Sequence, residues 1–208
     1  EARATASDLI VQQAAAQYQA TNDIASATAA VQQALVIAPG NDTARRAAVE
    51  LGLIELQASS QTASSSALQA MLASTIQQGL SAVSIDSSDY QNWLALAQLY
   101  QSLGGVGVSE AYPEALAAYQ KAAVANPTSP LPFLREGQVA LAQNDASSSV
   151  AYLDQALALK PDLAASYYLR SQAYLQLNDA TSALADAQQA LSLAQQGPLS
   201  WYNFGAVY

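Results

Sequence analysis

This chain of 208 residues contains no cysteine and no histidine. Their absence excludes disulfides, thiol nucleophiles and imidazole bases, and it removes the ligands that most zinc sites use. Long apolar runs are also missing, so no segment of the sequence is long enough to span a bilayer. We therefore expect no metal, no cofactor and no transmembrane segment in this chain.

Charged residues are scarce, because seven basic and sixteen acidic side chains make up only 11% of the chain and give a net charge of −9. Nucleic-acid binding requires a basic surface, so we expect no nucleic-acid partner. Gln, Ser, Thr and Asn occupy the places that Lys and Glu usually take on solvated helices. This neutral surface favours an extracellular or cell-surface location. Because the chain begins at Glu1 rather than Met, we expect that a leader was removed or that the sequence is a fragment.

The stretch from residue 93 to residue 127 carries the clearest pattern. Its first half follows the motif W-x2-L-G-x2-Y, with Ala in place of the glycine, at Trp93, Leu96, Ala97 and Tyr100. Its second half follows the motif A-x3-F, then a small residue and a closing proline, at Ala115, Tyr119, Ala122 and Pro127. Small residues let two antiparallel helices approach closely, and large aromatic residues fill the space beside the contact. One such pair cannot bury its apolar face alone, so the pattern predicts stacked copies.

Copies of the pattern are present on both sides of this stretch. The steps from Asp8 to Asp42 and from Pro130 to Ala164 are both thirty-four residues. The sequence therefore resembles the tetratricopeptide repeat (TPR) family over nearly its whole length. The resemblance implies an all-α fold, a right-handed superhelical solenoid of antiparallel helix pairs. It further implies one domain over 1–208, with repeats at about 8–41, 42–89, 90–129, 130–163 and 164–197 and a half repeat at 198–208.

Local signals predict where the helices begin and end. We expect helices at about 7–20, 24–37, 42–57 and 67–84, with Ser7-Asp8 as the first N-cap and Pro113 at the first position of a later helix. Arg45 and Arg46 fall in a first helical turn, which is the unfavourable end for cations, so we expect their side chains to have partners elsewhere.

Insertions lengthen the second and third repeats. The Ser/Thr-rich stretch 59–66 is either a surface loop or helix extension, or an O-glycosylated patch. Residues 41–43, Asn-Asp-Thr, also fit the N-x-[ST] sequon.

Catalytic constellations are not apparent in the sequence. The pairs Asp86 with Asp89 and Asp154 with Asp162 lie where helix caps and turns need aspartate. The glycines at 104–107 lack the Lys-Ser/Thr pair and the preceding strand of a phosphate-binding loop. We therefore expect the protein not to be an enzyme.

The resemblance also predicts a binding surface, because the first helices of TPR repeats line a concave face. By register the partner-binding residues there are Leu94, Gln98, Leu134, Arg135, Gln138, Tyr168 and Gln172. The three glutamines are equivalent in successive repeats and form a ladder that could hydrogen-bond an extended peptide. The alternative is that glutamine is only the common polar residue of this chain. The Lys and Asn residues of the family's carboxylate clamp are absent here.

Two functions remain open for an interaction scaffold of this kind. One is a structural subunit that stacks head to tail into an extracellular filament, through edge residues Leu9, Val11, Tyr18, Trp201, Phe204 and Tyr208. The other is a peptide- or partner-binding module cut from a larger protein, such as one anchored in a membrane. The stretch 90–127 resembles the repeats appended to bacterial membrane glycan-ligase-like proteins, which favours an extracytoplasmic module of the second kind.

Overall fold

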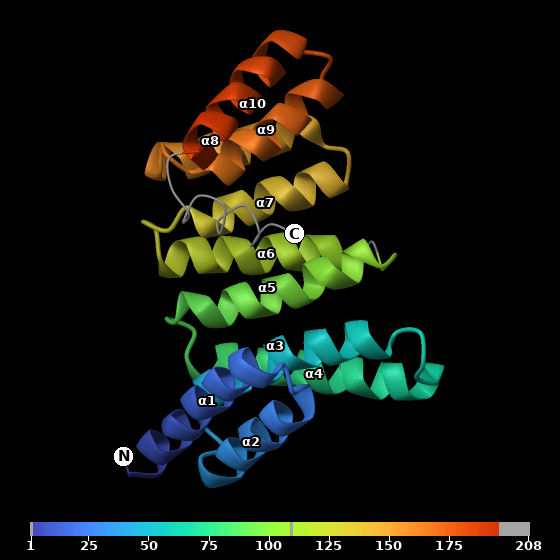
Figure 1. Ribbon diagram of the computed structural model, residues 1–208, viewed down its shortest axis with the longest axis vertical. Helices are drawn as coiled ribbons and strands as arrows, with labels where there is room; N and C mark the ends of the chain where they lie inside the picture. The colour runs from blue at the N-terminus through green and yellow to red at the C-terminus, as the bar shows by residue number, and fades with distance from the viewer. Residues whose placement is uncertain (1, 109, 196–208) are drawn as a thin grey trace. The chain divides into compact units, whose positions relative to one another are not determined.

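A computed structural model describes residues 2–108 and 110–195 of the chain (Figure 1). Within these residues the backbone forms α-helices joined by short connections, and no strand. The helices are α1 (Ala2–Thr21), α2 (Ile24–Ile37), α3 (Asp42–Ser59), α4 (Ser65–Ile85), α5 (Tyr90–Gly105), α6 (Ala111–Ala125), α7 (Leu131–Ala142), α8 (Ala146–Leu159), α9 (Ala164–Gln176) and α10 (Ala180–Gln195). The predicted all-α fold is confirmed.

An Asn-Asp dipeptide forms three of the turns between paired helices. The asparagine takes a positive φ of 54–60° at positions 22, 144 and 178, which Asn tolerates better than most residues. The aspartate that follows caps the next helix by accepting a hydrogen bond from a serine backbone N–H at 3.1 Å, in the pairs Asp23–Ser26, Asp145–Ser148 and Asp179–Ser182. This short motif ends one helix and begins its antiparallel neighbour.

Small residues bring the paired helices together, as the sequence predicts. A Cβ placed on Gly137 of α7 would lie only 2.7 Å from Leu153 Cγ on α8. The Ser149 hydroxyl donates to the carbonyl of Gly137 at 3.0 Å across the same contact. Leu153 is fully buried there, so the predicted register of the α7–α8 pair is confirmed.

The chain divides into two compact units, residues 1–102 and 103–208, with the boundary near the end of α5. In the first unit α2 packs against both α1 and α3, and α3 packs against α4. In the second unit α7 packs against α6 and α8, and α9 packs against α8 and α10. Each unit has apolar clusters of its own, such as Val49, Ala95 and Leu99 in the first and Leu134, Leu153 and Leu169 in the second.

A polar network ties the helix starts of the first unit together. Arg46 of α3 forms an ion pair with Asp89 at 2.7 Å and donates to Asn92 Oδ1 at 2.9 Å. Arg45 donates to the carbonyl of Pro39 and to Gln78 Oε1. Both arginines therefore have the distant partners that their unfavourable position in the helix predicts.

The first helix begins earlier than the sequence predicts. Ser7 is not the N-cap, because α1 starts at Ala2 and the alanine-rich segment before Ser7 is helical. The Ser7 side chain is instead fully buried, and its hydroxyl donates to the carbonyl of Ala34 at 2.9 Å. The prediction mistook a buried contact between helices for a cap.

Two further local predictions need correction. Helix α6 starts at Ala111, so Pro113 lies within the first turn rather than at its first position; a proline is tolerated there because the first backbone N–H groups have no partner in the helix. Asp154 is not in a cap or turn, because it lies inside α8 and pairs with Arg170.

The insertion at 59–66 mainly lengthens two helices. Helix α3 continues to Ser59 and α4 begins at Ser65, with Ser64 as its N-cap. Only a short turn separates them, which agrees with the helix-extending interpretation. The sequon residue Asn41 is buried, and its side-chain nitrogen donates to Ser7 and Asp8. An N-linked glycan there would break this contact, so the structure argues against the sequon.

Candidate functional site

The polar surface of α7 and α9 is the best candidate for the predicted binding site. It consists of Arg135 and Gln138 on α7 and Tyr168 and Gln172 on α9, all partly exposed. The two helices contact each other within the second unit. Each helix presents its two residues at a spacing of three or four, which places them on one face. Four of the seven predicted residues therefore lie on two helices that pack against each other.

A hydrogen bond within α7 orients the Arg135 side chain, which is the cation of this polar surface. Arg135 Nη1 donates to Gln138 Oε1 at 2.9 Å, one turn along the same helix. The guanidinium carries five N–H donors in a planar fork, a geometry that matches carbonyl and carboxylate oxygens. The Gln138 side chain carries both an amide oxygen and amide N–H donors. The pair can thus offer both charge and amide chemistry to a partner.

A leucine-rich core supports the polar surface from behind. Leu134 and Leu169 are buried beside Leu153, and Tyr168 packs against this cluster. Side chains on rigid, well-packed helices hold their geometry better than those on loops. The core therefore holds the backbone beneath these four side chains in place.

The two predicted leucines take a different place from the polar residues. Leu94 is only 9% exposed and Leu134 only 5%, so both contribute to the cores of their units. Gln98 is exposed on α5, in the first unit. The accessible part of the predicted site thus consists of its polar residues and Tyr168.

The residues predicted to form the subunit edges also differ in how exposed they are. Leu9 is 54% exposed, whereas Val11 is buried against Ala34 and Ala44. Tyr18 packs against a second cluster that includes Val31. Trp201, Phe204 and Tyr208 lie outside the described residues.

Arg170 forms a self-contained charged cluster beside the polar surface. Its guanidinium donates to both carboxylate oxygens of Asp186 at 2.7 and 2.8 Å and pairs with Asp154. It also lies 5.4 and 5.9 Å from the ring centres of Tyr167 and Tyr174. The hydrogen bonds that Arg170 donates to Asp186 raise the pKa of Arg170 above its usual value. These contacts occupy the cation, so we assign it to structure rather than to binding.

Glu136 is a buried carboxyl that the sequence reasoning missed. It lies on α7, is 1% exposed, and neither of its carboxylate oxygens accepts a hydrogen bond from the residues that the structure describes. Burial raises its pKa to about 7. Glu136 interacts electrostatically with the hydroxyls of Tyr119 on α6 and Tyr152 on α8, and burial raises the pKa of both tyrosines. Glu136 occupies the repeat position that Leu96 occupies in the preceding repeat. A charged residue at an apolar position of the pattern was the signal for a buried carboxyl.

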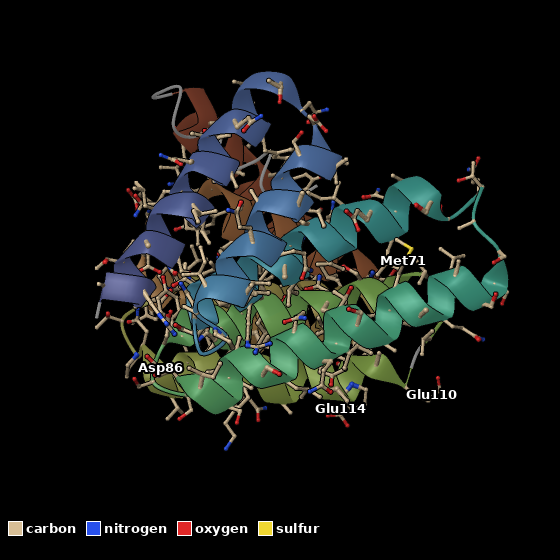
Figure 2. All side chains as sticks on the ribbon, turned by 90° about the horizontal axis from the view of Figure 1, so that it is seen from below. Met71, Asp86, Glu110 and Glu114 are labelled. Carbon is tan, nitrogen blue, oxygen red and sulfur yellow. The ribbon has the colours of Figure 1, made fainter. Side chains whose placement is uncertain are left out.

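A pocket of 310 Å³ in the first unit is the second missed feature. It lies among α2, α3 and α4, with Val31 and Leu51 as buried floor and Met71 of α4 on its wall. Figure 2 shows Met71 on the side of α4 that faces α3. Gly52 lies thirty-four residues after Tyr18. The repeat pattern places an aromatic side chain at this position. A glycine there leaves the volume of that ring unfilled, and this was the signal for a pocket.

Catalytic chemistry has few residues to use in this structure. Over 2–108 and 110–195 there is no group of three His, Cys, Asp or Glu side chains that could hold a metal ion. Within the same ranges, no helix is both long and apolar enough to cross a membrane. In the pocket, the Thr28 hydroxyl donates a hydrogen bond to the Glu55 carboxylate at 2.6 Å.

Comparison with known proteins supports the fold. No protein-family model and no curated protein matches the chain. A solved TPR protein from Thermus thermophilus, TTC0263, is 18% identical with a TM-score of 0.69, over 97% of this chain and 98% of that one. YrrB, described as a TPR protein with an unusual peptide-binding site, is 14% identical with a TM-score of 0.59, over 93% and 89%. PilW, a type IV pilus biogenesis factor, is 20% identical with a TM-score of 0.66, over 98% and 89%.

These similarities show that the chain has the TPR fold, as the resemblance in the sequence predicts. The predicted antiparallel helix pairs are present in both units. The right-handed sense of the superhelix stays a prediction. Because all three identities are low, fold similarity carries no function by itself.

Proposed function

We propose that this chain, which has the TPR fold, is a non-enzymatic protein-interaction module that binds an extended peptide segment of a partner on the polar surface of α7 and α9. The observation that carries the proposal is the set of partly exposed polar residues on two adjacent, rigid helices: Arg135, Gln138, Tyr168 and Gln172. Repeat folds commonly present binding residues on such repeated helices.

The chemistry of this surface suits a peptide backbone. An extended peptide exposes N–H donors and C=O acceptors at regular intervals, and glutamine side chains match both. Arg135 adds one cation to a chain of net charge −9, so it can bind a peptide carbonyl or a carboxylate. The missing Lys and Asn residues distinguish this surface from the carboxylate clamp of other TPR proteins. YrrB, whose fold is similar, is described as having a peptide-binding site of an unusual kind.

Peptide selection tests the proposal. A display library of random linear peptides is selected on the full chain, and the affinity of a selected peptide is measured for the wild type and for Arg135→Ala and Gln138→Ala. We expect each variant to weaken binding by about tenfold, the scale of one hydrogen bond that involves a charged group. Gln155→Ala, an exposed change on α8, is the matched control and should bind as the wild type does.

Thermal unfolding of the same variants separates binding from folding. Both α7 variants should melt with the wild type, because their side chains are not part of the core. Equal affinity of all four proteins for the selected peptide would move the binding site away from this surface.

A second candidate function is head-to-tail self-association into an extracellular filament. Exposed leucines on the first and last described helices support it, with Leu9 on α1 and Leu184 and Leu191 on α10. Exposed apolar patches often mark protein contacts. Light scattering of the full chain beside a Trp201→Asp, Phe204→Asp variant tests it: the proposal predicts large particles that the variant loses. A wild type that stays monomeric at high concentration would rule the filament out.

A further inference from the structure

The pocket in the first unit has a lining that is apolar at its floor and acidic at one side. Val31 and Leu51 are almost fully buried, and Met71 adds a flexible apolar wall from α4. Glu55 of α3 is the single charged residue among the described residues that line the pocket. A ligand that fills it must therefore combine an apolar stem with a group that suits a carboxylate.

The Glu55 carboxylate is positioned but not saturated. The Thr28 hydroxyl of α2 donates to Glu55 Oε1 at 2.6 Å, which fixes the side chain across the helices. In the part of the chain that the structure describes, no side chain donates to Oε2. A carboxylate has about four acceptor positions, so most of its capacity remains for a ligand.

Amide groups extend the polar side of the pocket. Gln32 of α2 and Gln78 of α4 also line it. Arg45 donates to Gln78 Oε1 at 2.8 Å, which orients that amide from outside. The Gln32 amide oxygen can accept a hydrogen bond from a cationic head group, so it complements Glu55 without adding charge, whereas Gln78 Oε1 already accepts from Arg45.

The dimensions of the pocket favour one long side chain. A volume of 310 Å³ lies at the lower end of ligand pockets, which span about 300–1,000 Å³. Exposed residues such as Ala70 and Ser74 also line the pocket, so it opens to the surface. A peptide backbone can therefore stay outside while one of its side chains enters.

We infer that this pocket binds an arginine side chain of a partner protein, with its aliphatic stem on Val31, Leu51 and Met71 and its guanidinium on Glu55. Arginine combines an apolar stem with a planar fork of donors that matches a carboxylate. The net charge of −9 attracts a basic partner over longer distances. The site lies in the first unit and does not depend on the peptide surface proposed for α7 and α9.

The probe for this inference is N-acetyl-arginine amide, with N-acetyl-citrulline amide as its neutral isostere. The chain has one methionine, Met71, so its ¹³C-labelled methyl signal reports on the pocket alone. We expect the arginine probe to shift this signal saturably and the citrulline probe to bind at least tenfold more weakly, the scale of a charge-assisted hydrogen bond. Equal affinity for the two probes would overturn the inference.

Two variants with matched controls sharpen this experiment. Glu55→Gln keeps the shape and removes the charge, and it should weaken the arginine probe about tenfold; Glu114→Gln removes the same charge from an exposed position on α6 and should not. Ala70→Phe fills the pocket from its exposed rim and should abolish binding, whereas Ala73→Phe lies on the same helix outside the lining and should not. Binding that survives both Glu55→Gln and Ala70→Phe would place the probe elsewhere and contradict the site.

Discussion

The helix pairs α3–α4 and α7–α8 both meet at a glycine. A pocket lies beside the contact in α3–α4, which we call the hollow pair, whereas a leucine fills the contact in α7–α8, which we call the full pair. A Cβ on Gly52 would lie 2.5 Å from Thr75 Oγ1, and a Cβ on Gly137 would lie 2.7 Å from Leu153 Cγ. Leu153 fills the space beside Gly137 and is fully buried. Beside Gly52 the chain leaves a pocket of 310 Å³. In both pairs a side chain of the second helix lies close to the glycine of the first, and the other side chains around the contact decide whether space remains.

Removing the side chain that fills the second pair should have the largest effect. Leu153→Ala would leave a cavity in a closely packed core, and we expect it to lower the free energy of unfolding by about 2–5 kcal/mol. Urea unfolding followed by circular dichroism measures the change. A cost below about 0.5 kcal/mol, the size typical of surface substitutions, would mean that Leu153 does not fill the contact between α7 and α8.

The buried charge beside this contact should have the next largest effect. Burial raises the pKa of Glu136 from 4.5 to about 7, so the folded state binds its proton more tightly than the unfolded state does. Its contribution to stability is therefore present below pH 4.5, falls as the pH rises towards 7, and is lost above it. One pKa unit corresponds to about 1.4 kcal/mol.

Replacing this carboxyl should consequently stabilise the protein. At about pH 8 we expect Glu136→Leu to raise the free energy of unfolding by roughly 2–4 kcal/mol. The isosteric variant Glu136→Gln should lose the decline in stability between about pH 5 and 7. Unfolding of the three proteins across this range measures both effects, and an unchanged pH dependence in Glu136→Gln would show that the decline comes from another group.

Adding a side chain to the full pair should cost somewhat less than emptying it. We expect Gly137→Leu to lower the free energy of unfolding by roughly 1–3 kcal/mol or more, because the new side chain meets Leu153. The higher helix propensity of leucine opposes this cost by only about 1 kcal/mol. An unchanged melting temperature would refute the register of the two helices.

The smallest effect is expected at the hollow pair. Met71 lines an open pocket, so Met71→Ala removes few contacts that the folded state depends on. We expect a change in the free energy of unfolding below about 1 kcal/mol, in contrast to Leu153→Ala. Similar costs for the two variants would remove the distinction between the pairs.

The sequence predicted the full pair better than the hollow one, for a physical reason. Gly137 and Leu153 follow a register that requires a small residue opposite a large one, so their contact could be predicted from spacing alone. The pocket depends on several helices together, because residues from α2, α3 and α4 all line it. A pattern within one repeat cannot show the space that remains between neighbouring repeats.

The proposed binding surface on α7 and α9 shows the same limit of sequence-based prediction for single residues. Register assigned Arg135, Gln138, Tyr168 and Gln172 to the accessible face of first helices, and the structure has these four side chains partly exposed. The repeat register alone could not distinguish surface from core positions for Leu94 and Leu134, which are buried. How deeply a side chain is covered depends on the tilt of the neighbouring helix, and spacing along one chain does not contain that information.

One NMR titration tests the difference between the two helix pairs most directly. The full chain is labelled on its methionine and leucine methyl groups and titrated with N-acetyl-arginine amide. We predict that the methyl signal of Met71 shifts saturably and that the methyl signals of Leu153 stay in place. Shifts of equal size at both residues, or a Met71 signal that does not move, would contradict a hollow, ligand-accepting α3–α4 pair beside a full α7–α8 pair.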